Sequence, residues 1–176
     1  ISDLHICYND ENGNGKKLVD LLKDIKNRNC DHLVITGDLV ENPEIKDLIY
    51  VKEILSHFDY TDSSKLSIVP GNHDIFGGAK KGIEEGLFFS NVCKNVNYNE
   101  NVDKFIEVFK DSFNSEMSFP YLKIFDDIAI IGINSIDHWS AEKNPEGSNG
   151  RIDKNEIKKL KKIFTSEEVK GKYILV

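Results

Sequence analysis

The sequence has no long apolar run, few cysteines and no excess of positive charge, and each absence excludes a class of protein. A membrane-spanning helix needs roughly 18 or more consecutive apolar residues, and the 176-residue chain contains no such run, so no membrane contact is expected. Its three cysteines are widely separated and form no CxxC pair, which argues against a disulfide framework and favours a reduced, cytoplasmic protein. The formal net charge of −7 argues against an extended nucleic-acid-binding surface, because such surfaces cluster Lys and Arg.

An initiator methionine and a secretory signal are also absent from the sequence. Residues 1–6 have the pattern of the end of a buried strand, and residues 173–176 have that of a strand that stops in mid-course. We therefore expect the natural protein to extend past both ends, and residues 1–176 to form a single, partial domain.

Predicted strands and helices alternate along the chain, which is typical of an α/β fold. Continuous β-branched and apolar runs at residues 33–36 and 66–69 predict buried strands. Apolar residues at helical spacing predict helices over residues 15–28 and 43–58.

The second half of the chain has softer patterns, mostly set by turn residues and caps. The predicted elements are short helical turns or loop over 77–99, a helix over 102–113 capped by Asn101, a hairpin over 121–133, a polar loop over 134–150 and a helix that Asp153 caps.

Three short polar motifs follow three of the predicted strands: Asp3-Leu4-His5, Gly37-Asp38 and Gly71-Asn72-His73-Asp74. In open α/β sheets the carboxyl ends of the strands face one crevice, where ligands bind. Carboxylate, amide and imidazole donors suit Mn, Fe, Zn or Ni rather than a metal that prefers thiolates. The motifs therefore predict a metal site at this edge of the sheet.

The spacing within the motifs suggests how these donors are divided. Residues two apart in an extended segment point to the same side, so Asp3 and His5 are predicted to bind one ion together. Asp38 follows a buried strand and a glycine that permits a sharp turn, and it is predicted to reach between two ions. Asn72 offers an amide oxygen to the second ion, whereas His73 points elsewhere and is a candidate to protonate a leaving alkoxide.

The ordered set resembles the signature of the calcineurin-like metallophosphoesterase superfamily, which reads Asp-x-His, then Gly-Asp, then Gly-Asn-His-Asp/Glu. The resemblance covers essentially the whole chain, and residues 1–5 and 69–74 are closest in motif to the branch that includes cyclic-nucleotide phosphodiesterases. It implies a layered α/β/β/α sandwich, of which this chain is the N-terminal part. It also implies a binuclear centre of two divalent metal ions, Mn, Fe, Zn or a mixture, as cofactors.

The resemblance assigns metal-binding roles to four residues: Asp3 and His5 at the first metal, Asp38 as the bridge and Asn72 at the second metal. It assigns His73 the role of general acid or transition-state stabiliser. Glu41 lies where some family members carry an acid that pairs with the catalytic histidine, so Glu41 is a candidate to orient His73. An exposed loop glutamate is the equally weighted alternative for Glu41.

One departure from the family pattern concerns the later ligands. The family completes its site with a further histidine and a Gly-His-x-His motif, and this sequence contains neither. We interpret the gap as truncation and expect the span on its own to bind metal poorly and to be inactive. In the polar loop, His138 and Trp139 are candidates to contact substrate, and packing of the loop is the favoured interpretation of both.

The resemblance implies two-metal-dependent hydrolysis of a phosphodiester or phosphomonoester by a metal-bridging hydroxide, with His73 as general acid. The expected partner is a small phosphorylated substrate, with nucleotides among the candidates, and the sequence indicates no oligomeric state. The alternative function is a non-catalytic binding or scaffold module that keeps the phosphoesterase fold. A nuclease of the same superfamily is disfavoured, because no basic patch with interleaved aromatic residues is present.

Overall fold

The computed structural model describes residues 1–9, 13–84, 86–114 and 117–176. The elements are α1 (Asn14–Asn27), β1 (Leu33–Thr36), α2 (Ile45–His57), β2 (Leu66–Val69), α3 (Asn72–Phe76), α4 (Lys80–Glu84), α5 (Phe89–Lys94), α6 (Tyr98–Val108), η1 (Lys110–Ser112), β3 (Tyr121–Ile124), β4 (Ile128–Gly132), α7 (Lys154–Phe164), η2 (Glu167–Val169) and β5 (Tyr173–Leu175). Helices and strands alternate, as predicted, from α1 to β2, and in the described residues four helices and a 3-10 turn then precede the hairpin of the second half.

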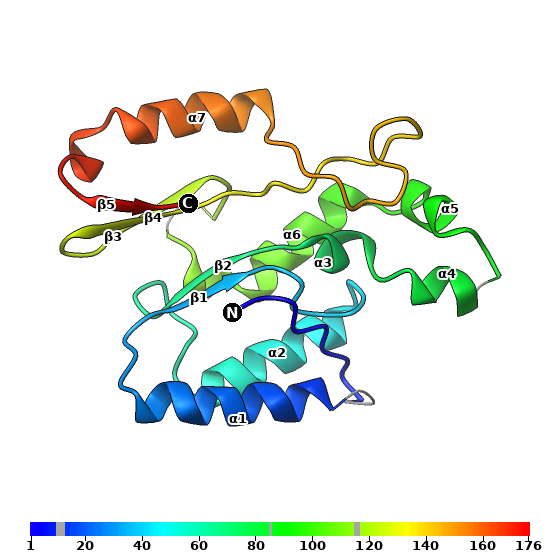
Figure 1. Ribbon diagram of the computed structural model, residues 1–176, viewed down its shortest axis with the longest axis horizontal. Helices are drawn as coiled ribbons and strands as arrows, with labels where there is room; N and C mark the ends of the chain where they lie inside the picture. The colour runs from blue at the N-terminus through cyan, green and yellow to red at the C-terminus, as the bar shows by residue number, and fades with distance from the viewer. Residues whose placement is uncertain (10–12, 85, 115–116) are drawn as a thin grey trace.

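The first sheet is a parallel pair of β1 and β2, whose bounds match the predicted strands. Leu33 lies opposite Leu66, and Thr36 lies opposite Val69, so both strands end at the same edge. Helices α1 and α2 cover one face of this pair (Figure 1). They pack there because each carries an apolar stripe at helical spacing, from which residues such as Leu22 are fully buried.

Residues 1–6 run beside β1 and begin as the end of a strand would, since Ile1 donates to the carbonyl of Val34 at 2.8 Å and accepts the N–H of Thr36 at 3.0 Å. However, no regular strand extends from residue 1 to residue 6. Within this segment Ile6 alone forms a β-bridge, to Val40. The backbone enters the left-handed region at Asp3 (φ 54°) and at His5 (φ 46°), and these turns interrupt an extended ladder.

The segment between the two sheets folds into the short helices α3, α4 and α5 and the longer α6. The predicted cap at Asn101 is wrong, because α6 begins at Tyr98 and its cap is Asn97, whose side chain accepts the N–H of Glu100. Asn97 and Glu100 have the three-residue spacing of a capping box, which outcompetes the later asparagine. Asn101 instead donates its side-chain amide to the carbonyl of Ile75 in α3, at 2.8 Å.

The second sheet contains the predicted hairpin of β3 and β4, with β5 parallel to β4. Helix α7 covers its outer face and is capped, as predicted, by Asp153, which accepts the N–H of Asn155. The hydroxyl of Tyr121 ties the two sheets together: it accepts the N–H of Ile68 at 2.9 Å and donates to the carbonyl of the same residue at 3.1 Å.

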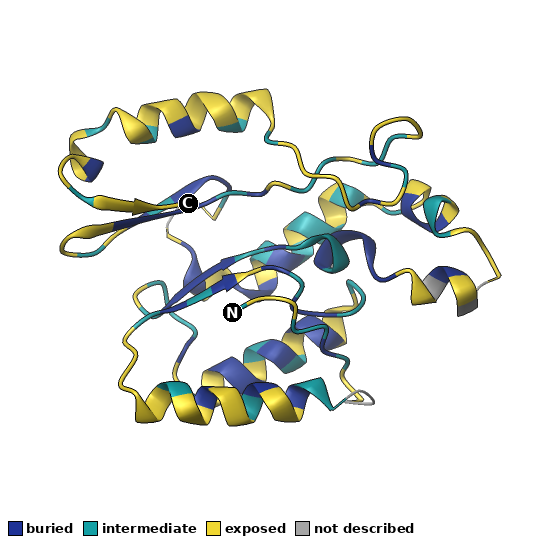
Figure 2. Cartoon of the chain, in the orientation of Figure 1, coloured by how far each residue is buried: buried dark blue, intermediate teal, exposed yellow. Residues whose placement is uncertain are grey.

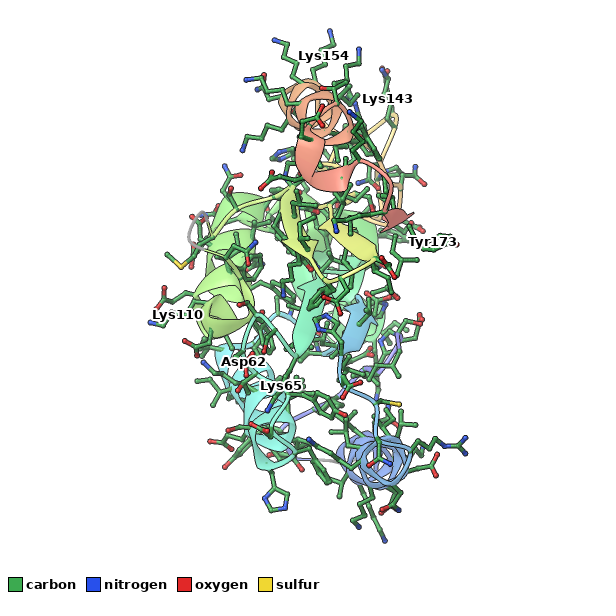
Figure 3. All side chains as sticks on the ribbon, turned by 90° about the vertical axis from the view of Figure 1, so that its left-hand side faces the viewer. Asp62, Lys65, Lys110, Lys143, Lys154 and Tyr173 are labelled. Atoms are coloured by element: carbon green, nitrogen blue, oxygen red, sulfur yellow. The ribbon has the colours of Figure 1, made fainter. Side chains whose placement is uncertain are left out.

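Four layers result, in the order α1/α2, β1–β2, β3–β4–β5 and α7 (Figures 1 and 3). Buried residues follow β1, β2 and β4 and the inner faces of α1 and α2, whereas β5 and the outer face of α7 are exposed (Figure 2). Lys154 of α7 projects away from the layers at one end of the side view (Figure 3). The layering confirms the predicted α/β/β/α architecture, and it leaves the loops after β1 and β2 side by side at one edge.

Candidate metal centre

The site lies where residues 3–6 meet the loop that follows β1. The N–H groups of Leu4 and His5 both donate to the carbonyl of Asp38, at 2.7 and 3.0 Å. Asp3, His5 and Asp38 all have positive φ values, the last at 52°, a conformation that typically costs a non-glycine residue of order 1–3 kcal/mol. Asp and His tolerate it better than most residues. The loops therefore hold three motif residues in a strained conformation, as functional loops commonly do.

Two glycines allow the loops after β1 and β2 to touch. A Cβ atom on Gly37, whose φ is 101°, would lie 2.7 Å from the Cα of Gly71. A Cβ atom on Gly71 would lie 2.2 Å from Oδ1 of Asp38. The motif glycines are thus required by the close approach of two backbones, and this approach brings Asp38 next to the His73 loop.

Asp74 joins the same two loops from beneath and is fully buried. Its Oδ1 accepts the N–H groups of Leu39 (2.9 Å) and Val40 (3.0 Å), and its Oδ2 accepts that of Gly71 at 2.8 Å. Burial raises the pKa of Asp74 to about 7 against the opposing effect of these three amides, and the charge of nearby Asp38 adds to the rise. Asp74 is part of the third motif, but no role was predicted for it, because two of its partners, Leu39 and Val40, belong to another loop.

Three potential metal ligands converge above this frame. His5, Asp38 and His73 each offer a ligand atom, and these atoms all lie within 4.8 Å of one another. The centroids of the His5 and His73 imidazole rings are 4.3 Å apart, edge to face, and Oδ1 of Asp38 accepts the backbone N–H of His73 at 2.9 Å. Two imidazoles and a carboxylate, all half-buried, are a donor set that fits Mn, Fe or Zn.

Glu41 lies between the two histidines, where its Oε2 is 3.3 Å from Nδ1 of His5 and 3.6 Å from Nδ1 of His73. Its backbone carbonyl is also 3.3 Å from Nδ1 of His73. Gly78 covers the carboxylate, since a Cβ atom there would lie 2.1 Å from Oε1 of Glu41. The structure therefore places Glu41 beside His73, in a covered position and not in an exposed loop.

The remaining predicted ligands occupy the edges of this group. Asp3 is exposed and lies outside the set of ligand atoms within 4.8 Å, because the left-handed turns replace the strand alternation that would have paired it with His5. Asn72 is half-buried at the start of α3, directly before His73. The structure thus brings His5, Asp38, His73 and Glu41 together and places Asp3 and Asn72 at the ends of the same loops.

The two substrate-contact candidates from the polar loop lie apart from this group. His138 is exposed, stacks on Tyr98 with 3.9 Å between ring centroids, and lines a cavity of about 250 Å³ whose walls include none of the three clustered ligands. Trp139 packs against Phe76 and Cys93, and its indole N–H donates to the carbonyl of Pro145 at 3.1 Å. Packing of the loop accounts for the position of Trp139, whereas His138 is exposed at the cavity wall.

The fold and the site together define a layered α/β protein with a carboxylate–histidine centre at the ends of parallel strands. The family model of the calcineurin-like phosphoesterases matches residues 1–172, so the chain belongs to the calcineurin-like phosphoesterase family. Membership confirms the superfamily predicted from the motifs and supports metal-dependent phosphoesterase activity in general. A comparison with curated proteins gives no match.

In the described part of the chain, every helix is too short or too polar to cross a lipid bilayer.

Proposed function

We propose that this protein hydrolyses a phosphodiester or phosphomonoester of a small molecule at a centre of two divalent metal ions. The observation that carries the proposal is that His5 and Asp38, as candidate ligands, and His73, as candidate proton donor, converge within 4.8 Å where residues 3–6 meet the loops after β1 and β2. Family membership supports the general chemistry. The cyclic-nucleotide branch and a nucleotide substrate remain predictions from the motifs.

Four residues would hold the ions: Asp3 and His5 the first, Asn72 the second, and Asp38 both. When bound, two such ions lower the pKa of a water molecule and neutralise charge on the phosphoryl oxygens. Asp38 is suited to its place because its loop is fixed on both sides: its carbonyl accepts two N–H groups from residues 4 and 5, and its Oδ1 accepts the N–H of His73. Oriented ligands of this kind reduce the reorganisation that metal binding requires.

His73 is the proposed proton donor to the leaving oxygen. Its Nδ1 faces the carboxylate and the carbonyl of Glu41, so Glu41 would hold the proton on Nδ1. The proton to be donated would be the second one of the imidazolium, on Nε2, and its transfer to the leaving oxygen would leave a neutral imidazole with its remaining proton on Nδ1. A positioned general acid contributes typically 10²- to 10⁴-fold to a rate. Glu41 would orient the imidazole and hold the proton on the nitrogen that faces away from substrate.

The test is hydrolysis of a chromogenic phosphodiester and of a phosphomonoester by the full-length protein, with and without added Mn²⁺. Asp38→Asn keeps an oxygen for the N–H of His73 but removes the charge between the ions, so we expect turnover to fall by at least about 10³-fold with the fold intact. Asp20→Asn, at an exposed residue of α1, is the matched control and should turn over normally.

Substantial activity in Asp38→Asn would refute the bridging role. Metal binding is measured in parallel by elemental analysis. A full-length protein that neither binds metal nor turns over either ester would support the scaffold alternative instead.

A further inference from the structure

Helix α6 carries a pair of polar residues, one turn apart, that the proposed chemistry does not use. The ammonium of Lys104 donates to Oδ1 of Asn101 at 2.9 Å. Both side chains are half-buried. Because the amide oxygen of Asn101 is occupied by Lys104, its N–H₂ group is oriented the other way, toward α3.

Each member of the pair holds a different site segment. The amide of Asn101 donates at 2.8 Å to the carbonyl of Ile75, which lies two residues after His73 in α3. The ammonium of Lys104 donates at 3.2 Å to the carbonyl of Pro43, which lies two residues after Glu41. One hydrogen-bonded chain therefore runs from the His73 segment through α6 to the Glu41 segment.

Near the site the two segments touch directly, since a Cβ atom on Gly77 would lie 2.8 Å from Oδ1 of Asn42. Beside this contact, residues of both segments and of α6, among them Pro43, Phe76, Asn101 and Lys104, line a cavity of about 340 Å³, and the hydrogen bonds of the pair join the segments across its rim. Hydrogen bonds from a charged donor such as the Lys104 ammonium are stronger than those between neutral groups. A second, weaker contact joins the same segments nearer the site, where Gly78 donates to the side chain of Asn42 at 3.4 Å.

We propose that Asn101 and Lys104 are positioning residues that set the separation of Glu41 and His73, and so keep Nε2 of His73 directed at the leaving oxygen. The inference rests on the proposed function, because it assigns His73 the role of proton donor. The pair touches neither substrate nor metal, and it acts through the backbone at Pro43 and Ile75. Small displacements of a catalytic group can lower a rate about 10²-fold, so loosening this connection changes catalysis more than it changes binding.

The experiment measures kcat and KM of the full-length parent protein and of its Lys104→Met and Asn101→Ala variants. The substrates are two phosphate esters that differ only in their leaving groups. A nitrophenolate leaves with little protonation, whereas an alkoxide requires it. We expect kcat for the alkyl ester to fall roughly tenfold or more, kcat for the nitrophenyl ester to fall less than about threefold, and KM for both to change less than about twofold. Lys104→Arg keeps the two donors and should restore most of the alkyl-ester rate.

Lys52→Met is the matched control, because Lys52 also ties α2 to a distant segment, through Asp111 at 2.9 Å, but remote from both site segments. It should leave the ratio of the two rates unchanged. Equal losses on both esters in Lys104→Met would indicate a general structural role and would overturn the proposal. Unchanged rates in both Lys104→Met and Asn101→Ala would overturn it as well.

A measurement without turnover separates this proposal from the proposed function. Imidazole ¹⁵N resonances of the metal-free protein report the surroundings of each histidine, and we expect those of His73 to shift in Lys104→Met while those of His57 and His138 stay in place. If His73→Ala lowers the rates for the alkyl ester and the nitrophenyl ester by the same factor, the proton-donor role fails. The imidazole resonances of His73 in the Lys104 and Asn101 variants then decide whether the pair positions His73. Unshifted His73 resonances in both variants would rule the positioning role out.

Discussion

Two fully buried polar residues organise loops in this protein, Asp74 beneath the metal centre and Asn144 in the polar loop 134–150, and they do so in opposite ways. Asp74 accepts N–H groups from the loops after β1 and β2, so it fixes segments that are far apart in sequence. Asn144 donates to the carbonyl of Asp137 and accepts the N–H of Asn149, so it stabilises its own loop. A site assembled between segments depends on the whole fold, whereas a self-contained loop can change without disturbing its neighbours.

The strongest test of this contrast is Asp74→Ala. The substitution leaves three N–H groups of two loops without an acceptor in a buried place, and each such group costs about 1–3 kcal/mol. We expect the free energy of unfolding to fall by roughly 3–5 kcal/mol, a range that allows for partial relaxation, and turnover of the folded fraction to fall by at least about 100-fold, because Asp38 and His73 lose their common support. Urea unfolding and metal-dependent turnover measure the two effects.

Asp74→Asn serves as the graded control. Its amide oxygen can still accept from Leu39 and Val40, and its N–H₂ group would face the N–H of Gly71, so a smaller loss of both quantities is expected. An Asp74→Ala protein that unfolds early but turns over normally when folded would show that the loops do not depend on each other for catalysis.

Lys123 of β3 also connects distant segments by hydrogen bonds, but at the other end of β2, away from the site. The residue is 4% exposed, and its ammonium donates to the carbonyls of Leu66 and Ser112. Burial lowers the pKa of Lys123 from 10.5 to about 8, against a smaller opposing effect of Asp62. If support between segments matters for activity only near the metal centre, this residue should affect stability alone.

The sign of its pH dependence follows from proton binding. Between pH 8 and 10.5 the unfolded chain holds more protons on this amine than the folded chain does, so its contribution to the free energy of unfolding rises with pH, by about 2 kcal/mol from pH 7.5 to 9.5. Below pH 8 the cost of charging the buried amine is fully present. Lys123→Met should show a flatter profile over this range in urea unfolding, with normal turnover at pH 7.5. Identical profiles for the two proteins would contradict the lowered pKa.

The elements that the sequence predicted well are those that local signals determine. The strands at 33–36 and 66–69 follow from continuous β-branched runs, and the start of α7 follows from Asp153. The three motifs are short and follow strands or an extended segment, and for this reason the edge at which the candidate ligands His5, Asp38 and His73 converge could be predicted from the sequence. The pairing of Glu41 with His73 came from the resemblance and from no local rule.

The features that the sequence could not predict depend on contacts between distant segments. Asp3 does not pair with His5 by strand alternation, because hydrogen bonds to the loop after β1 impose left-handed turns on both residues. Asn101 was predicted to cap α6, but Asn97 is the cap, and the side chain of Asn101 instead donates a hydrogen bond to the carbonyl of Ile75 in α3. The role of Asp74 requires knowledge of where two other loops lie. Such misses concentrate in and around the site, where tertiary contacts override local preference.

The smallest expected effect belongs to Asn144→Ala in the self-contained loop. The change leaves the carbonyl of Asp137 and the N–H of Asn149 without their partner, and because this loop lies at the surface, water can replace part of what is lost. We expect the free energy of unfolding to fall by about 1–2 kcal/mol, with kcat and KM for either ester within about twofold of the parent protein. Glu142→Ala, at an exposed residue of the same loop, is the control and should change the free energy of unfolding by less than about 0.5 kcal/mol. A loss of turnover in Asn144→Ala comparable to that in Asp74→Ala would mean that loop 134–150 forms part of the catalytic unit. The contrast between a site assembled from distant segments and a loop stabilised by its own residues would then no longer hold.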